Sequence, residues 1–127
     1  MAGRLTTHVL ELSCGKPAEG MRLELYRFNE LGERLHLLGG STNADGRVDS
    51  PLLEGELLRT GVYELVFHVA EYYRAQQQRG GKGGEPEGAS IPFLDEVPIR
   101  FGVGDADSHY HVPLLVAPGG YSTYRGS

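Results

Sequence analysis

The stretch Tyr63-Glu-Leu-Val-Phe-His-Val69 decides the fold class of this 127-residue chain. Its large apolar side chains, Tyr63, Leu65, Phe67 and Val69, occupy every second position. Successive side chains of a β-strand point to opposite faces, so a period of two predicts a strand with one buried face. This segment is the clearest inward-facing strand in the sequence.

The same alternation recurs along the rest of the chain. Nineteen glycines and seven prolines punctuate it, at the spacing of roughly eight to twelve residues that favours an all-β sandwich or barrel. One stretch, Glu71 to Gln78, lacks β-branched residues and is predicted as a short helix. Further strands are predicted at Leu5–Leu12, Met21–Tyr26, Arg34–Leu37, Val97–Phe101 and Tyr110–Val116, and the tail from Tyr121 to Arg125 is expected to add a last one.

Turn residues separate these strands. Asn29 to Gly32 predicts a hairpin end, and Pro118-Gly-Gly joins the last two strands. Asn43-Ala-Asp-Gly46 predicts a turn in which Gly46 adopts a positive φ. That tetrapeptide is similar to the start of a calcium loop, but the carboxylate due six residues after the glycine is replaced by Leu52. The glycine-rich segment 79–92 predicts a flexible surface loop.

Length and composition predict a single domain, residues 1–127. The net charge of −5, with no basic run, argues against nucleic-acid binding. Cys14 is the only cysteine, which excludes an intrachain disulfide and fits a reducing compartment. The absence of an apolar run of about 20 residues argues against a membrane span, and the N-terminus has no signal-like apolar region. A cytoplasmic location is therefore expected.

Two histidines near the C-terminus are the first candidates for chemistry. His109 and His111 lie on the same face of a predicted strand. A His-x-His pair occurs in zinc sites, but three or four ligands are needed, and no metal is expected here. A half-exposed polar face is the alternative interpretation of the pair. Covalent catalysis by serine is poorly supported, because the chain contains no Gly-x-Ser-x-Gly elbow.

A combination of residue types indicates chemistry more strongly than any one residue. His8 lies in the first predicted strand, where a purely structural role is the alternative, and Arg47 follows the turn glycine. The last seven residues contain two tyrosines and an arginine, an unusual content for a tail without a function. Neutral histidine accepts a proton near physiological pH, and arginine stabilises a developing oxyanion. Together these residues form a water-activating set.

Four segments of the sequence together form a recognisable pattern. In order along the chain they are Leu5-Thr-Thr-His-Val-Leu with Gly15-Lys-Pro-Ala, Thr42-Asn-Ala-Asp-Gly-Arg47, His109-Tyr-His-Val-Pro-Leu-Leu, and Tyr121-Ser-Thr-Tyr-Arg-Gly-Ser127. They resemble the motifs of the 5-hydroxyisourate hydrolase family, which is related to transthyretin. The terminal motif is the most specific of the four, because it separates the hydrolases from transthyretin. The resemblance covers residues 5 to 127.

The resemblance implies an eight-stranded, two-sheet transthyretin-like sandwich with one short helix. It also implies a homotetramer, a dimer of dimers, with active sites in a channel between the dimers and no metal or organic cofactor. The implied reaction hydrolyses the six-membered ring of 5-hydroxyisourate to give 2-oxo-4-hydroxy-4-carboxy-5-ureidoimidazoline, between urate and allantoin. The implied catalytic residues are His8, Arg47, His111 and Tyr124, and the implied substrate-binding residues are His8, Arg47, Tyr124, Arg125, Gly126 and Ser127.

On this interpretation His111 activates water while His8 orients the substrate or relays the proton, although the two roles can be exchanged. Arg47 binds the carbonyl edge of the substrate and Tyr124 closes the pocket. The chain departs from the family at Glu11, where an aspartate is usual, and in the long loop 79–92. A transthyretin-like carrier and a purely structural module are the rival hypotheses. Neither requires a base and a cationic clamp, and a carrier would favour an apolar lining.

Overall fold

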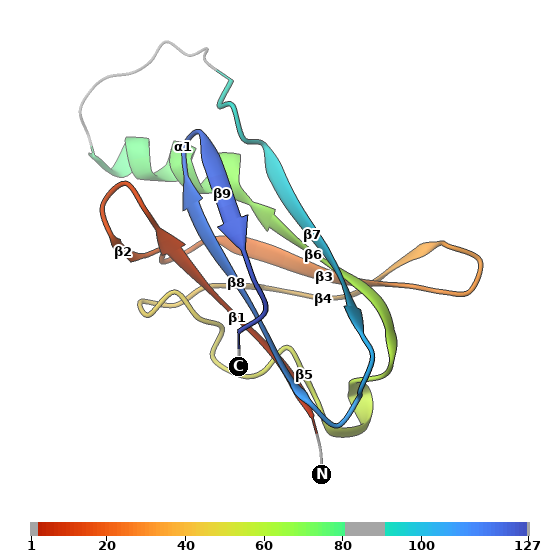
Figure 1. Ribbon diagram of the computed structural model, residues 1–127. Helices are drawn as coiled ribbons and strands as arrows, with labels where there is room; N and C mark the ends of the chain where they lie inside the picture. Colours follow the sequence, from red (N-terminus) through yellow and green to blue (C-terminus); the bar gives the residue numbers. More distant parts are fainter. Residues whose placement is uncertain (1–2, 81–90, 127) are drawn as a thin grey trace.

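Two β-sheets packed face to face form the protein (Figure 1). The computed structural model describes residues 3–80 and 91–126. The sheet that we call the β1 sheet contains β1 (Arg4–Glu11), β2 (Lys16–Pro17), β5 (Leu53–Glu54), β8 (His109–Ala117) and β9 (Gly120–Thr123). The sheet that we call the β3 sheet contains β3 (Arg22–Phe28), β4 (Arg34–Ser41), β6 (Gly61–His68) and β7 (Glu96–Val103).

The strand order is β2-β1-β8-β9 in the first sheet, where β5 also pairs with β1, and β4-β3-β6-β7 in the second. β1 and β8 run parallel, whereas the other strand pairs are antiparallel. One helix, α1 (Val69–Gly80), follows β6 directly, and a short 3-10 helix (Gly55–Leu57) precedes that strand. The hairpin of β3 and β4 extends beyond the body of the sandwich (Figure 1).

The predicted alternation is what builds the core. Along β1, Leu5, Thr7 and Val9 are buried between the sheets, while Thr6 and His8 lie half-buried on the opposite face. Each strand that follows this rule supplies one apolar face, and burial of those faces is the main favourable term in folding. The largest fully buried side chains are Tyr63, Phe67, Leu5, Met21, Leu23, Leu25, Leu65 and Leu114.

The structure confirms the predicted two-sheet sandwich with one short helix. The prediction missed β2 and β5, because strands of two residues carry no periodic signal. The helix is longer than predicted and includes residues 79 and 80, which the glycine content predicts as part of the loop. Residues 81–90 of that expected loop lie outside the described residues. No helix in the described part of the chain is long and apolar enough to cross a membrane.

Glu11 attaches the helix to the end of β1. Its buried carboxylate accepts hydrogen bonds from the Ser13 hydroxyl, the Cys14 amide and the Tyr73 hydroxyl of α1. Burial alone would raise the pKa of this carboxyl, but the hydrogen bonds from Tyr73, Ser13 and Cys14 outweigh burial and lower the pKa. Glu11 therefore stays ionised and fixes the position of α1.

Candidate active site

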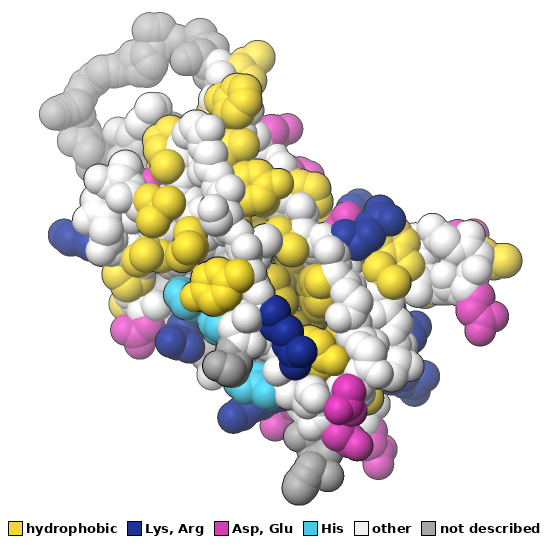
Figure 2. Space-filling view, viewed as in Figure 1, with side chains coloured by type: hydrophobic (Ala, Val, Ile, Leu, Met, Phe, Trp, Pro, Cys, Tyr) yellow, Lys and Arg dark blue, Asp and Glu magenta, His cyan; other side chains and the backbone are white. Residues whose placement is uncertain are grey.

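The parallel pairing of β1 with β8 brings the candidate histidines together. In the register of these strands Thr6 lies opposite His111 and Arg4 lies opposite His109. Residues of one parity share a face of a strand, so Thr6 and His8 on β1 meet His109 and His111 on β8. Figure 2 shows histidine side chains reaching the surface on this side of the molecule, among Lys and Arg side chains.

A continuous chain of hydrogen bonds links four side chains, which we call the histidine network: His8, His111, Thr6 and His109. Nδ1 of His8 lies 2.9 Å from Nε2 of His111. Nδ1 of His111 lies 2.8 Å from the Thr6 hydroxyl oxygen, which in turn lies 3.1 Å from Nε2 of His109. The rings of His8 and His111 have centroids 5.1 Å apart and are inclined by 20°. Each bond is within normal hydrogen-bonding distance.

A tight turn places Arg47 beside His8. Gly46 has φ +74°, and a Cβ there would lie 2.5 Å from the backbone oxygen of Val9, so only glycine fits. The Val9 amide donates to the Gly46 carbonyl at 2.8 Å, and Arg47 forms an antiparallel bridge with His8. Asn43 Oδ1 accepts hydrogen bonds from the amides of Asp45 and Arg47, which confirms the predicted turn.

Burial and positive charge keep the central histidines neutral. Burial lowers the pKa of His8, and the nearby charge of Arg47 lowers it further. Burial also lowers the pKa of His111, with added contributions from His8, Arg47 and His109. Both effects disfavour the imidazolium form. At neutral pH the pair therefore offers lone pairs that can accept a proton.

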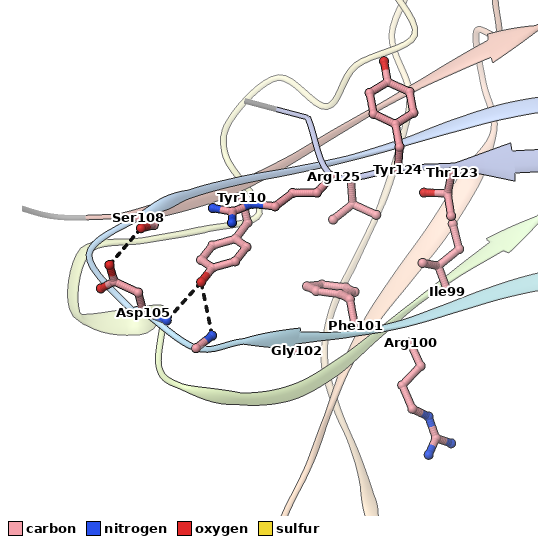
Figure 3. Close-up of a pocket in the computed structure, with 12 residues that line it drawn as sticks. Ile99, Arg100, Phe101, Gly102, Asp105, Ser108, Tyr110, Thr123, Tyr124 and Arg125 are labelled. Atoms are coloured by element: carbon pink, nitrogen blue, oxygen red, sulfur yellow. Dashed lines mark hydrogen bonds between the residues drawn. The ribbon is translucent and has the colours of Figure 1, made fainter.

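The C-terminal segment turns back over β8 after β9. The Gly126 amide donates to the backbone oxygen of His111 at 2.7 Å. A Cβ at Gly126 would lie 2.8 Å from Cδ2 of the His111 ring, so the tail packs directly on that imidazole. Tyr124 is 55% exposed and points away from Phe101 and Tyr110 (Figure 3). Ser127, the last predicted binding residue, lies outside the described residues.

Arg125 points to the other side of the tail from Tyr124. Its guanidinium lies 4.2 Å from the centroid of the Tyr110 ring and donates to the His109 backbone oxygen at 3.2 Å. This side of the tail borders a cavity of about 720 Å³ between β7 and strands β8 and β9 (Figure 3). Ile99 and Phe101 contribute apolar lining, whereas the histidine network takes no part in it. The cavity and the network are therefore separate features.

A family model described as the HIUase/Transthyretin family matches residues 5–126. The chain belongs to this family. A protein of Rhizobium meliloti (strain 1021) called 5-hydroxyisourate hydrolase 2 is 54% identical over 99% of this chain and 98% of its own length. The solved structure of Klebsiella pneumoniae 5-hydroxyisourate hydrolase has a TM-score of 0.74 at 34% identity, over 98% of this chain and 99% of that chain.

A second similar solved structure is longer than this chain. It is a crystal structure of (S)-allantoin synthase, with a TM-score of 0.85 and 42% identity. The match covers 99% of this chain but only 44% of that one. The sandwich described above thus corresponds to less than half of that larger protein.

The structure brings His8, His111, Arg47 and Gly126 together, with Tyr124 on the same tail and the Arg125 guanidinium directed to the cavity side. The sequence alone does not single out Thr6, and it leaves a half-exposed polar face as an alternative interpretation of His109. Residue parity already placed Thr6 on the face of His8, a signal that identifies it in retrospect. Within residues 3–80 and 91–126 no group of three or more His, Cys, Asp or Glu side chains is arranged to hold a metal ion.

Proposed function

We propose that this protein hydrolyses 5-hydroxyisourate to 2-oxo-4-hydroxy-4-carboxy-5-ureidoimidazoline during the degradation of urate to allantoin. The observation that carries the proposal is a hydrogen-bonded His8–His111 pair, held neutral, with Arg47 beside it. This set supplies a proton acceptor and a cation at one half-buried position. The 54% identity to the Rhizobium meliloti enzyme supports the choice of substrate.

The hydrogen bonds favour His8 as the general base, the exchanged form of the sequence-based hypothesis. Both ring nitrogens of His111 are occupied, one by His8 and the other by Thr6. In the described part of the chain Nε2 of His8 has no hydrogen-bond partner, so it is the nitrogen that can receive a proton from water. His111 then orients His8 and shares the charge that develops on it.

The proposed reaction begins when water adds to the ring carbonyl carbon next to the bond that breaks. The water oxygen forms the new C–O bond, and one of its protons moves to Nε2 of His8. The carbonyl electrons collect on oxygen, where the Arg47 guanidinium stabilises the negative charge. The intermediate collapses, the C–N bond breaks, and His8 returns the proton to the leaving nitrogen. The net change is the addition of one water molecule.

The C-terminal residues close the proposed site. Tyr124 donates a hydrogen bond to the substrate and covers it. Gly126 completes the wall beside His111, a role that its contact with the His111 ring supports. Ser127 is assigned to substrate binding with it. The contacts of Arg125 with Tyr110 and His109 suit a residue that anchors the tail, so it acts on substrate through the position of its neighbours.

The proposed assembly is a cytoplasmic homotetramer, a dimer of dimers, in which a neighbouring subunit covers the exposed tail. Tyr121 and Tyr124 are 44% and 55% exposed in the isolated chain, so the tail presents two aromatic side chains that a neighbouring subunit would cover. Analytical ultracentrifugation measures the assembly. A monomer at the concentrations used for catalysis would contradict this part of the proposal.

The test of the activity uses 5-hydroxyisourate generated freshly by urate oxidase. Its ultraviolet absorbance decays spontaneously, and the protein is expected to accelerate that decay. His8→Ala and His111→Ala are each expected to lower kcat by about 10²–10⁴-fold without loss of assembly. His36→Ala, on the far β3 sheet, is the matched control and should retain activity. Saturable binding without accelerated decay would instead favour a carrier.

A further inference from the structure

The hydroxyl of Thr6 lies between two histidines on the same face of the β1 sheet, and this position has a consequence for proton placement. We propose that Thr6 and His109 are positioning residues that fix the tautomer of His111 and so leave Nε2 of His8 unprotonated. The inference rests on the proposed hydrolase function, because only that form of His8 can accept a proton from water. It extends the site to two residues that do not contact the substrate.

Counting protons in the histidine network leaves two arrangements. When all its members are neutral, each of the three imidazoles and the Thr6 hydroxyl carries one proton. Three of these four protons are used in the three hydrogen bonds of the network. The fourth must lie at one end, on Nε2 of His8 or on Nδ1 of His109. A proton at one end therefore excludes a proton at the other.

The direction of the Thr6 hydroxyl selects between the two arrangements. If Thr6 donates to His109, then Nδ1–H of His111 donates to Thr6, Nδ1–H of His8 donates to His111, and Nε2 of His8 is bare. If Thr6 donates to His111, every bond reverses and Nε2 of His8 carries a proton. His109 is the acceptor that draws the hydroxyl proton away from His111. It thus supports the basic form of His8 from the far end of the network.

The surrounding charges are cationic at both ends of the network. Arg47 forms an antiparallel backbone β-bridge with His8, and its charge acts electrostatically on both His8 and His111. At the other end Arg4 pairs with His109 across the strands, and Arg125 donates to the backbone oxygen of His109. A cation beside His8 favours the arrangement in which the N–H groups point away from that residue. Arg4 and Arg125, at the His109 end, favour the reverse arrangement, but of these three arginines only Arg47 acts electrostatically on His8 and His111. The dominant charge therefore acts in the same direction as the Thr6–His109 hydrogen bond.

Variants of Thr6 separate its hydroxyl from its shape. Thr6→Val keeps a β-branched side chain in the strand but removes the hydroxyl, and we expect kcat to fall by about threefold to tenfold with KM nearly unchanged. Thr6→Ser keeps the hydroxyl and should retain most of the wild-type kcat. Equal losses in both variants would mean that Thr6 matters only for packing and would overturn the proposal.

Variants of His109 test whether an acceptor is what the network needs. His109→Leu removes the acceptor, so Thr6 can turn to His111, and kcat should fall by a similar factor of about threefold to tenfold. His109→Gln offers a carbonyl oxygen to the Thr6 hydroxyl and should restore the rate. Failure of the glutamine variant to exceed the leucine variant would overturn the role of His109.

A direct readout comes from the imidazole nitrogens. Long-range proton–nitrogen correlation spectra of the assembled, histidine-labelled protein at about pH 8, where neutral histidine dominates, distinguish protonated from bare ring nitrogens. We expect His8 to carry its proton on Nδ1 in the wild type and in Thr6→Ser. In Thr6→Val and His109→Leu a measurable fraction should move to Nε2. An Nε2-protonated His8 in the wild type, or tautomers that do not change in the variants, would overturn the inference.

The kinetic assay and the nitrogen spectra test different claims, so either claim can be contradicted without the other. If the wild type does not accelerate the decay of 5-hydroxyisourate, the proposed function is wrong, while the nitrogen spectra still test the proton arrangement. If the wild type is active and the tautomer shifts in Thr6→Val without any change in kcat, then the positioning role is wrong although the hydrolase function stands. A tautomer shift accompanied by a lower kcat, reversed in the serine and glutamine variants, supports the proposal.

Discussion

The outer faces of the two sheets both carry histidines, and they use them differently. On the β1 sheet, His8 and His111 bond to each other and to a neutral hydroxyl, with Arg47 as the neighbouring charge. On the β3 sheet, Nε2 of His36 and Nε2 of His68 lie 2.9 Å and 2.8 Å from the two carboxylate oxygens of Glu24. The residue type is the same, but the charge beside it is opposite.

This difference shows why the partner of a histidine, rather than the histidine itself, identifies a site. Hydrogen bonds from His68 and then His36 lower the pKa of Glu24, so the β3 sheet holds a stabilised carboxylate. On the β1 sheet burial and Arg47 lower the pKa of His8, so that sheet holds a neutral imidazole. The charge of the carboxylate is balanced by its histidine partners. A neutral histidine pair beside a cation, in contrast, can still accept a proton.

The largest expected effect comes from removing that cation. Arg47→Gln should lower kcat by about 10²–10³-fold, because the oxyanion loses its charged donor. It should also move the acid limb of the kcat/KM profile to higher pH. In the wild type this limb should lie below 6.5, the usual histidine value, and loss of Arg47 removes one of the two causes of the depression. Burial, the larger cause, remains, so the limb should stay below 6.5.

Two further arginine variants sharpen the result. Arg47→Lys keeps the charge but loses the planar fork, so its acid limb should match the wild type while its rate falls less than in Arg47→Gln. Arg22→Gln removes a cation of the β3 sheet that pairs with Glu71 and Glu24, and its activity should be unchanged. An acid limb that moves to lower pH in Arg47→Gln would contradict the electrostatic account. Apparent values in such profiles belong to the coupled histidine pair.

A smaller effect is expected from adding one methyl group to the tail. The Cβ of Gly126→Ala would lie 2.8 Å from the His111 ring, so either the ring or the tail must shift. We expect kcat to fall by about tenfold, the cost of roughly 1.4 kcal/mol of lost alignment. Gly119→Ala is the matched control, since no atom lies within 4 Å of its Cβ, and its kinetics should be unchanged. Equal kinetics for the two variants would show that the tail does not constrain His111.

Local sequence patterns predicted the strands but could not predict which strands become neighbours. The parity of β1 placed Thr6 and His8 on one face, and the parity of β8 did the same for His109 and His111. Only the parallel pairing of two segments more than 100 residues apart sets Thr6 opposite His111. The sequence of either segment alone does not indicate this long-range register. The hydrogen bonds that link Thr6 to His111 and His109 therefore could not be predicted.

Alternation along a strand does not by itself predict exposure. His68 lies on the outer side of its strand, yet it is only 9% exposed and hydrogen-bonds to Glu24. Leu35 and Leu37 follow the predicted alternation in β4 but remain 46% and 42% exposed, because their hairpin extends past the core. Periodicity indicates which residues share a face, whereas burial depends on what packs against that face.

The smallest expected effect is on the β3 sheet, where Glu24→Gln removes the carboxylate shared by His36 and His68. A carboxyl whose pKa is lowered in the folded state stabilises the protein above its unfolded pKa of 4.5, and that contribution is lost as pH falls through the folded value. The variant should therefore be less stable by under about 1 kcal/mol at pH 6 and no less stable at about pH 3. Denaturant titrations at the two pH values measure the difference.

Activity decides whether the two faces are independent. Because the partners of Glu24 within residues 3–80 and 91–126 all lie on its own side of the sandwich, Glu24→Gln should leave both kcat and the acid limb of the pH profile at their wild-type values. A shift of that limb would mean that charge on the β3 sheet reaches His8 through the core. The contrast between a base on one face and a carboxylate on the other would then be a coupled property of the whole sandwich.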